Sequence, residues 1–153
     1  MKSSFRITAI ATLVAAIASL TPAMHAQMNL TARVDVPFPF DYGMKHFGPG
    51  LYTISKDGPN FLTVLSRNGG GAMAIVLSDS ESNLRGDNKV IFHKYGDRYF
   101  LAEVLIADRG DRITVSESNA EKHADREYRE QIKNGLAPTQ VALTLLPEHA
   151  PGN

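Results

Sequence analysis

Three titratable residues in one part of the sequence have the types that acid–base chemistry needs. His93 and Glu103 lie in the apolar stretch 90–106, and Asp97 lies between them. A positioned histidine or carboxylate can transfer a proton as general acid or base, and a carboxylate among apolar side chains has a raised pKa unless a cation pairs with it. One hypothesis is therefore a hydrolase that uses Glu103, Asp97 or His93.

The same residues also fit a β-hairpin. The stretches on either side of Gly96-Asp97 have the composition of strands, and this pair suits a two-residue turn. Counted outward from the turn, the register pairs Tyr95 with Arg98, His93 with Phe100 and Ile91 with Ala102 on one face, and Phe92 with Leu101 and Val90 with Glu103 on the other. In this register His93 and Glu103 point to opposite faces of the sheet, which argues against a dyad formed by the two.

The predicted hairpin also supplies the candidate ligand- or partner-binding residues. Both of its faces are rich in apolar and aromatic side chains, so we expect it to lie centrally in a sheet or to line a cavity. Aromatic side chains can contact sugars or peptides, although cross-strand packing is the simpler explanation for most of them. The candidates are His93, Tyr95, Arg98, Tyr99, Phe100 and Glu103.

Motifs for metals, cofactors and nucleophiles are absent from the sequence. The histidines have neither the H-x-H nor the H-E-x-x-H spacing of metal sites, and the chain has no cysteine. No serine lies in a G-x-S-x-G or S-x-x-K motif, and no G-K-[ST] follows the three glycines 69–71. We therefore predict no catalytic residue, no metal site and no cofactor.

The composition excludes several classes of protein. Lys and Arg together number 16, as do Asp and Glu, whereas proteins that bind DNA or RNA usually carry a strong basic excess. We therefore expect no nucleic-acid partner. The absence of cysteine excludes disulfides, iron–sulfur clusters and the lipid-bearing cysteine of a bacterial lipoprotein. Hydrophobic residues make up 43% of the 153, which is enough for the core of one domain.

The first 26 residues have the anatomy of a secretory signal peptide. Lys2 and Arg6 precede an uncharged apolar run over residues 7–20, which is shorter than the ~20 residues that a membrane span needs. Small residues follow, so cleavage is expected after Ala26 or after Ala23. We expect an exported chain, periplasmic or extracellular, without a membrane anchor. Its mature form would be slightly acidic, because cleavage removes two basic residues.

Turn signals divide the rest of the chain into short segments in which apolar and polar residues alternate. This pattern predicts a mainly β fold. The pattern indicates an antiparallel β-sandwich or a partly open β-barrel of about seven or eight strands, in one domain over residues 27–146. Residues 1–26 would precede this domain, and residues 147–153 would form a disordered tail. Segment 74–77 is apolar on both faces, so we expect both sides of its strand to be covered. The expected strands are 30–36, 51–56, 61–66, 72–78, 90–95, 98–106, 112–115 and 141–146.

One helix is expected in the C-terminal half of the chain. Ser118 and Glu121 have the spacing of a capping box, and the helical pattern runs to Asn134, just before Gly135. The apolar stripe of this helix is narrow and its other positions are largely charged. We interpret it as a surface helix that leans on the sheet, with partner binding as the alternative.

Two segments carry longer patterns. Segment 36–54 (VPFPFDYGMKHFGPGLYTI) combines an aromatic strand end, a glycine, a Pro-Gly turn and a G-x-Y-x-I strand, and segment 90–104 is VIFHKYGDRYFLAEV. Both resemble hallmarks of an uncharacterised family of small exported bacterial β-rich proteins. The resemblance implies a secreted or periplasmic β-rich domain, and it implies no activity.

The sequence supports three hypotheses of different kinds. The first is an exported, non-enzymatic binding or structural module of the cell envelope, whose partner is a protein, a glycan or a small ligand. The second is a carrier of small apolar ligands, which needs a barrel with an apolar cavity. The third is the hydrolase, which needs two titratable side chains within hydrogen-bond reach in one cleft. The partner and the oligomeric state stay open at this point.

Overall fold

The computed structural model describes residues 31–80, 84–132 and 138–146. The predicted signal peptide (1–26) and the predicted tail (147–153) lie outside the described residues. Within the described ranges, no helix has both the length and the apolar character that crossing a membrane requires.

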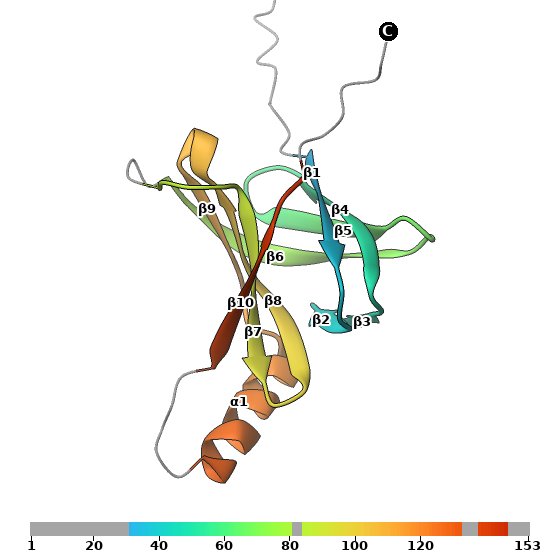
Figure 1. Cartoon of the computed structure of the whole chain (residues 1–153), viewed down its shortest axis with the longest axis vertical. Helices are drawn as coiled ribbons and strands as arrows, with labels where there is room; N and C mark the ends of the chain where they lie inside the picture. The colour runs from blue at the N-terminus through green and yellow to red at the C-terminus, as the bar shows by residue number, and fades with distance from the viewer. Residues whose placement is uncertain (1–30, 81–83, 133–137, 147–153) are drawn as a thin grey trace, which may run out of the picture.

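The described residues fold into a mainly β structure with one α-helix in the C-terminal half, as predicted (Figure 1). Each predicted strand is present, with bounds that shift by up to two residues. The helix ends at Gln131, earlier than predicted. The elements are β1 (Thr31–Val36), β2 (Phe40–Tyr42), β3 (Lys45–Phe47), β4 (Gly50–Lys56), β5 (Phe61–Ser66), β6 (Gly71–Ser80), β7 (Lys89–Tyr95), β8 (Arg98–Ile106), the 3₁₀ turn η1 (Ala107–Arg109), β9 (Asp111–Val115), α1 (Asn119–Gln131) and β10 (Thr139–Thr144).

Strands β2 and β3 are additions that the alternation of the sequence does not predict. Each has three residues, too few to show a period of two, and they form a hairpin around Gly43, whose φ is +61°. Strand β2 pairs with β8 in parallel, through Asp41 and Phe100, whereas the other strand pairs are antiparallel. The sheet is therefore mixed and not purely antiparallel.

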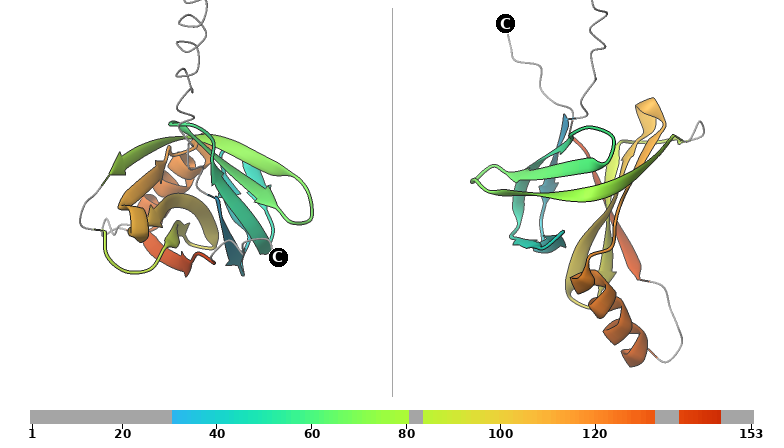
Figure 2. Two further views of the ribbon diagram at one scale, coloured as in Figure 1. Left: turned by 90° about the horizontal axis from the view of Figure 1, so that it is seen from above. Right: turned by 180° about the vertical axis from the view of Figure 1, so that it is seen from behind.

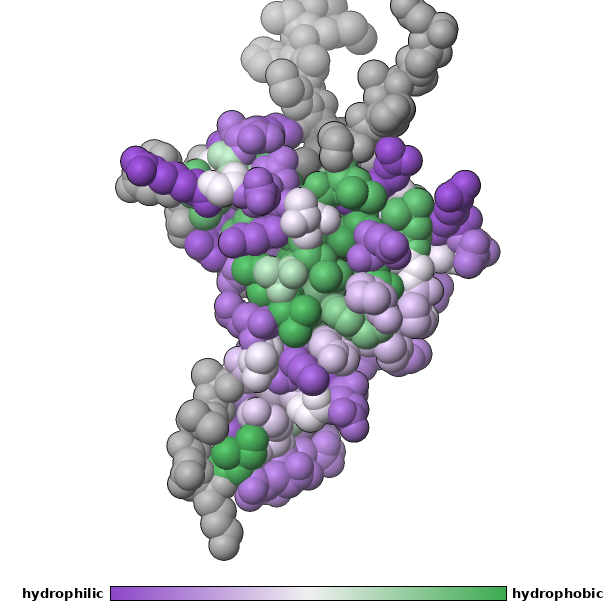
Figure 3. All heavy atoms as spheres, in the orientation of Figure 1, coloured by the Kyte–Doolittle hydropathy of each residue, from purple (hydrophilic) through white to green (hydrophobic). Residues whose placement is uncertain are grey.

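Eight of the strands curl into a partly open barrel in the order β10-β7-β8-β9-β6-β5-β4-β1 (Figures 1 and 2). The edge strands β1 and β10 approach each other at the bridge between Arg33 and Leu146, where the two N···O distances are 3.4 and 2.7 Å. The sheet is not closed. Apolar side chains come to the surface where β1 and β10 face each other (Figure 3), and Val141 and Leu143 of β10 are partly buried against the core.

Aliphatic side chains from all sides fill the interior of the barrel. The inward positions of the strands are occupied mainly by β-branched residues and leucine, which pack well on a pleated surface. Complete burial of one such side chain stabilises the fold by about 1.5–3 kcal/mol. No more than 1% of the surface is exposed at Val34, Val36, Ile54, Leu62, Val64, Val76, Val90, Val104 and Ile113.

One side of β6 is open, contrary to the prediction that both sides of segment 74–77 are covered. Val76 points into the core and is 0% exposed, whereas Ile75 and Leu77 are 59% and 65% exposed. The alternation of side chains along a strand places these two on the outer face. The apolar character of that face therefore has no explanation in the packing of the described fold.

A β-bulge in the hairpin β7–β8 corrects the predicted register. Phe92 pairs with Leu101 as predicted, but Ile91 pairs with Glu103, so that Ala102 is an additional residue in β8. The predicted pairs of Ile91 with Ala102 and of Val90 with Glu103 are therefore wrong. Because residues two apart on a strand share a face, Glu103 lies on the same face as His93, and not on the opposite face as predicted.

Candidate functional site

Helix α1 lies against the outer face of the hairpin β7–β8 (Figure 1). Ser118 is its N-cap, and the Ser118 hydroxyl accepts a hydrogen bond from the backbone N–H of Glu121 at 3.1 Å. This half of the predicted capping box is present. The side chain of Glu121 takes another direction, since one of its carboxylate oxygens lies 2.9 Å from Nδ1 of His93.

His93 and Glu121 form a hydrogen-bonded pair that is largely withdrawn from solvent. Only 5% of the Glu121 side chain and 21% of the His93 side chain are exposed. The hydrogen bond to Glu121 raises the pKa of His93 above its usual value, while burial lowers it, and the charges of Glu121, Glu103 and Glu117 add to the upward shift. Glu121 thereby has the hydrogen-bond partner that a buried carboxylate requires.

Aromatic rings surround this pair and attach α1 to the hairpin. Tyr95 contacts Phe100 at 5.7 Å and Tyr128 of α1 at 5.9 Å between ring centroids, both in edge-to-face geometry. Ala124 completes the cluster. Burial raises the pKa of Tyr95. Packing of this kind stabilises the contact between helix and hairpin and explains two of the candidate aromatic residues without a ligand.

The remaining candidates also have structural partners. Glu103 accepts a 2.6 Å hydrogen bond from Arg112 of β9, the neighbouring strand. Tyr99 lies on the other face of the hairpin, where its ring stacks on Phe38 at 4.0 Å. The guanidinium of Arg98 lies over the ring of Phe100, with its central carbon 5.0 Å from the centroid. The six candidates therefore do not converge on one site.

Asp97 is at the hairpin tip, where a cavity of about 260 Å³ separates the tip from α1. Tyr95, Arg98, Ala124 and Tyr128 contribute to its lining, but His93 and Glu103 do not. Asp97 thus lies apart from His93 and Glu103, which share a face of the hairpin but have separate hydrogen-bond partners. Within the described residues, no group of three or more His, Asp or Glu side chains is placed to hold a metal ion.

A second surface was not predicted from the sequence. Five large apolar side chains project from the outer face of β5 and β6, and we call this surface the outer apolar face. Phe61 lies directly opposite Ile75, and the other members flank this pair along the two strands. Exposed fractions are 44% for Phe61, 48% for Leu65, 56% for Met73, 59% for Ile75 and 65% for Leu77.

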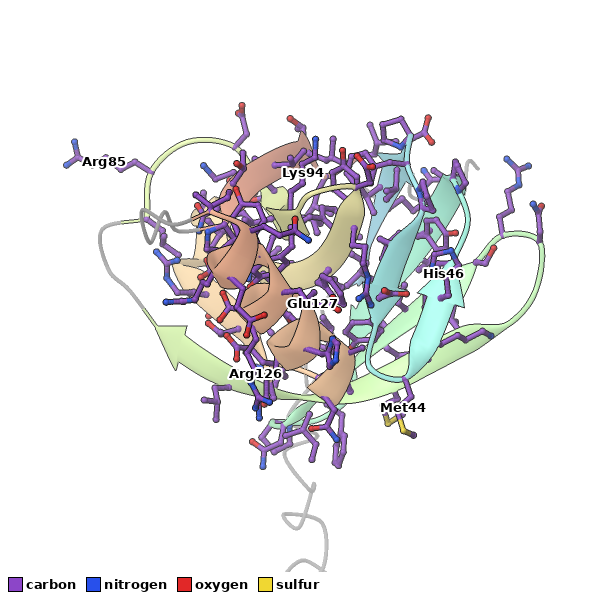
Figure 4. All side chains as sticks on the ribbon, turned by 90° about the horizontal axis from the view of Figure 1, so that it is seen from below. Met44, His46, Arg85, Lys94, Arg126 and Glu127 are labelled. Atoms are coloured by element: carbon purple, nitrogen blue, oxygen red, sulfur yellow. The ribbon has the colours of Figure 1, made fainter. Side chains whose placement is uncertain are left out.

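The outer apolar face continues past the edge of β6. Met44, at the tip of the β2–β3 hairpin, is fully exposed and projects outward beside β6 (Figure 4). A groove of about 520 Å³ lies between Met44, Ile75 and the residues that lead into α1, Ser116 and Ser118. Apolar surface therefore extends from β5 across β6 to the start of the helix.

The neighbouring edge of β6 is blocked by polar contacts from the β2–β3 hairpin. The hydroxyl of Tyr42 accepts a hydrogen bond from the backbone N–H of Ala74 at 3.2 Å and donates one to the carbonyl of Leu62. Nζ of Lys45 donates to the carbonyl of Gly71 at 3.3 Å. The Lys45 bond occupies a backbone carbonyl of β6, whereas Leu62 belongs to β5, which already pairs with a strand on each side. The fold therefore leaves the outer face of β6, and not this edge, available for contact with another molecule.

No protein-family model, no curated protein and no solved structure matches this chain.

Proposed function

We propose that this chain is an exported, non-enzymatic module that binds a protein partner through its outer apolar face. Export is supported by the signal-peptide anatomy of residues 1–26 and by the resemblance to small exported bacterial proteins. The binding role is supported above all by one observation, the exposure of five large apolar side chains on adjacent strands.

The size of the outer apolar face favours a binding role. A fully exposed large apolar residue presents a surface on the order of 200 Å². Multiplied by their exposed fractions, the five residues together expose roughly 500 Å². The largest apolar patch of a typical monomer covers about 300–600 Å² and is often functional. This face is at the upper part of that range before Met44 is added.

The chemistry of the face favours a protein partner over a glycan. Interface cores between proteins are enriched in aromatic residues and methionine and depleted of charge, and Phe61 and Met73 fit this composition. Sugar sites combine aromatic rings with polar groups that hydrogen-bond the hydroxyls. Here the other members of the face are aliphatic residues and methionine, and the polar pair next to Phe61 is Asp57 with Thr63.

The pairing of the titratable residues argues against the hydrolase. His93 is hydrogen-bonded to Glu121, and Glu103 is hydrogen-bonded to Arg112. A general acid or base must instead be free to reach a substrate atom within about 2.6–3.2 Å. Both pairs have a sufficient structural explanation, because they give hydrogen-bond partners to carboxylates in largely buried positions.

Site-specific photocrosslinking in the native host tests this function. A photoreactive phenylalanine analogue at Met73 lies in the outer apolar face, and one at Ala142, exposed on β10, is the matched control. We expect a crosslinked product from position 73, its loss when Ile75→Lys is added, and none from position 142. No product at position 73, or equal products at both positions, would contradict the proposed function.

The small-ligand carrier is a second candidate, favoured by one cavity of about 370 Å³ at the end of the barrel where β1 and β10 bridge. Ile106 and Leu145 are among its apolar lining, and Oδ1 of Asn88 is buried beside it without a hydrogen-bond partner. Native mass spectrometry of the protein purified from its host tests this candidate. A stoichiometric bound small molecule supports it, and a ligand-free mass contradicts it.

A further inference from the structure

We infer that the partner of the outer apolar face is a second copy of this chain, and that the two faces pack together about a two-fold axis. The inference rests on the proposed function, because it names the partner for the same surface. Three features support it: the absence of charge at the strand positions of the face, the area that a pair of faces would bury, and the alternation of large and small side chains on the surface.

The strand positions of the outer face carry no charged side chain over three adjacent strands. In a two-fold interface each residue meets the same surface of the other copy, so any charged residue near the axis would confront its own kind. The strand positions avoid that cost, and Asp57, whose carboxylate accepts a hydrogen bond from Thr63, lies at the end of the face beside Phe61. The outward positions of the strands are Leu51, Thr53 and Ser55 of β4, Phe61, Thr63 and Leu65 of β5, and Gly71, Met73, Ile75 and Leu77 of β6.

The area that two faces would bury is sufficient for a specific dimer. Each copy contributes roughly 500 Å² from its five apolar side chains, so a pair buries about 1,000 Å² before the Ser and Thr residues are counted. Specific interfaces begin at about that total and usually bury about 1,200–2,000 Å². The polar residues of β4, together with Met44, would supply the difference.

The relief of the face suits packing against itself. Phe61 and Ile75 form a ridge across the two strands, and Thr63 is the smaller position next to Phe61, whereas the Leu65 side chain covers Gly71. Two sheets pack face to face about 10 Å apart, with their strands rotated by about 30°, when the side chains of one fit between those of the other. Large and small residues on one surface allow each copy to provide both the ridge and the recess.

Analytical ultracentrifugation of the product of the full-length gene, with its N-terminus defined by mass spectrometry, tests the inference. We expect a reversible dimer whose Kd rises by about 100-fold or more in Ile75→Lys and in Met73→Lys, because each substitution places a charge in the interface twice. Ala142→Lys, on exposed β10, is the control and should leave Kd within about twofold. Circular dichroism should show an unchanged fold in all three variants.

Single cysteines give a second measurement, because the natural chain has none. A residue close to a two-fold axis meets its own copy, so at least one of Thr63→Cys, Met73→Cys and Ile75→Cys should form an intermolecular disulfide on mild oxidation. Ala142→Cys should not.

A wild-type chain that is monomeric at every concentration would overturn the inference, as would a dimer that both lysine variants leave intact. The crosslinking experiment at position 73 shows whether such a result also contradicts the proposed function. If the chain is monomeric but position 73 still crosslinks to a different protein, the face binds a partner that is not a second copy. If position 73 gives no crosslink either, both claims are wrong.

Discussion

Nδ1 of His93 lies 2.9 Å from a carboxylate oxygen of Glu121, and this contact joins the hairpin β7–β8 to helix α1. Glu121 is the one charged residue among the fully buried residues that the structure describes. The helix makes few other contacts with the sheet, chiefly those of Ala124 and Tyr128 with the aromatic residues of the hairpin. The pair therefore has a large share in holding α1 in place.

Removal of the histidine should release the helix. His93→Ala leaves the Glu121 carboxylate buried without its partner, which we expect to cost about 2–3 kcal/mol, less than for a completely buried pair because 21% of the His93 side chain is exposed. Since α1 is attached at one place, the loss should appear as local opening of the helix. Hydrogen exchange of the α1 amides measures this. The control is His123→Ala on the exposed side of α1, and equal protection in both variants would contradict the prediction.

The attachment of α1 should weaken as the pH rises. The pKa of His93 is raised above 6.5 in the folded state, so the stabilisation is fully present below pH 6.5 and is lost as the pH rises through the raised value. An NMR titration of His93 combined with hydrogen exchange of α1 measures both quantities. In Glu121→Gln the pKa of His93 should fall, because the main cause of its increase is removed. A His93 that titrates at or below 6.5 in the wild-type chain would show that the pair does not have this role.

Gly71 should tolerate no side chain. A Cβ at this position would lie 2.8 Å from the backbone carbonyl oxygen of Val64 and would also meet the side chain of Leu65. The backbone of β5 cannot yield easily, so we expect Gly71→Ala to lower the free energy of unfolding by about 1–3 kcal/mol. Gly48→Ala is the control, since nothing lies within 4 Å of its Cβ. Urea denaturation measures both variants, and equal midpoints would contradict the prediction.

Local signals in the sequence were sufficient for most of the elements. The alternation of residues 31–36 predicts β1, the pair Gly96-Asp97 predicts the hairpin turn, and Ser118 predicts the start of α1. Each of these signals depends on a few neighbouring residues and on backbone geometry. The same kind of signal was absent for β2 and β3, which have only three residues each.

The features that position the candidate sites depend on contacts between distant residues. The bulge at Ala102 leaves the apolar pattern of β8 almost unchanged, so the sequence does not reveal that Glu103 turns to the face of His93. Glu121 fits a capping box, but its actual partner lies 28 positions earlier in the chain. The apolar residues Ile75 and Leu77 indicate that the outer face of β6 is covered by other atoms. The sequence does not show whether those atoms belong to the same chain or to another molecule.

Oxidative footprinting of Met73 in the native host tests directly whether the outer apolar face is a binding surface. Met73 is 56% exposed in the isolated chain, so hydroxyl radicals should oxidise it readily in dilute purified protein. His123, which is exposed on α1, serves as the internal reference. We expect Met73 to be protected in the host relative to His123. Oxidation of Met73 in the host at the rate of the dilute protein would contradict it.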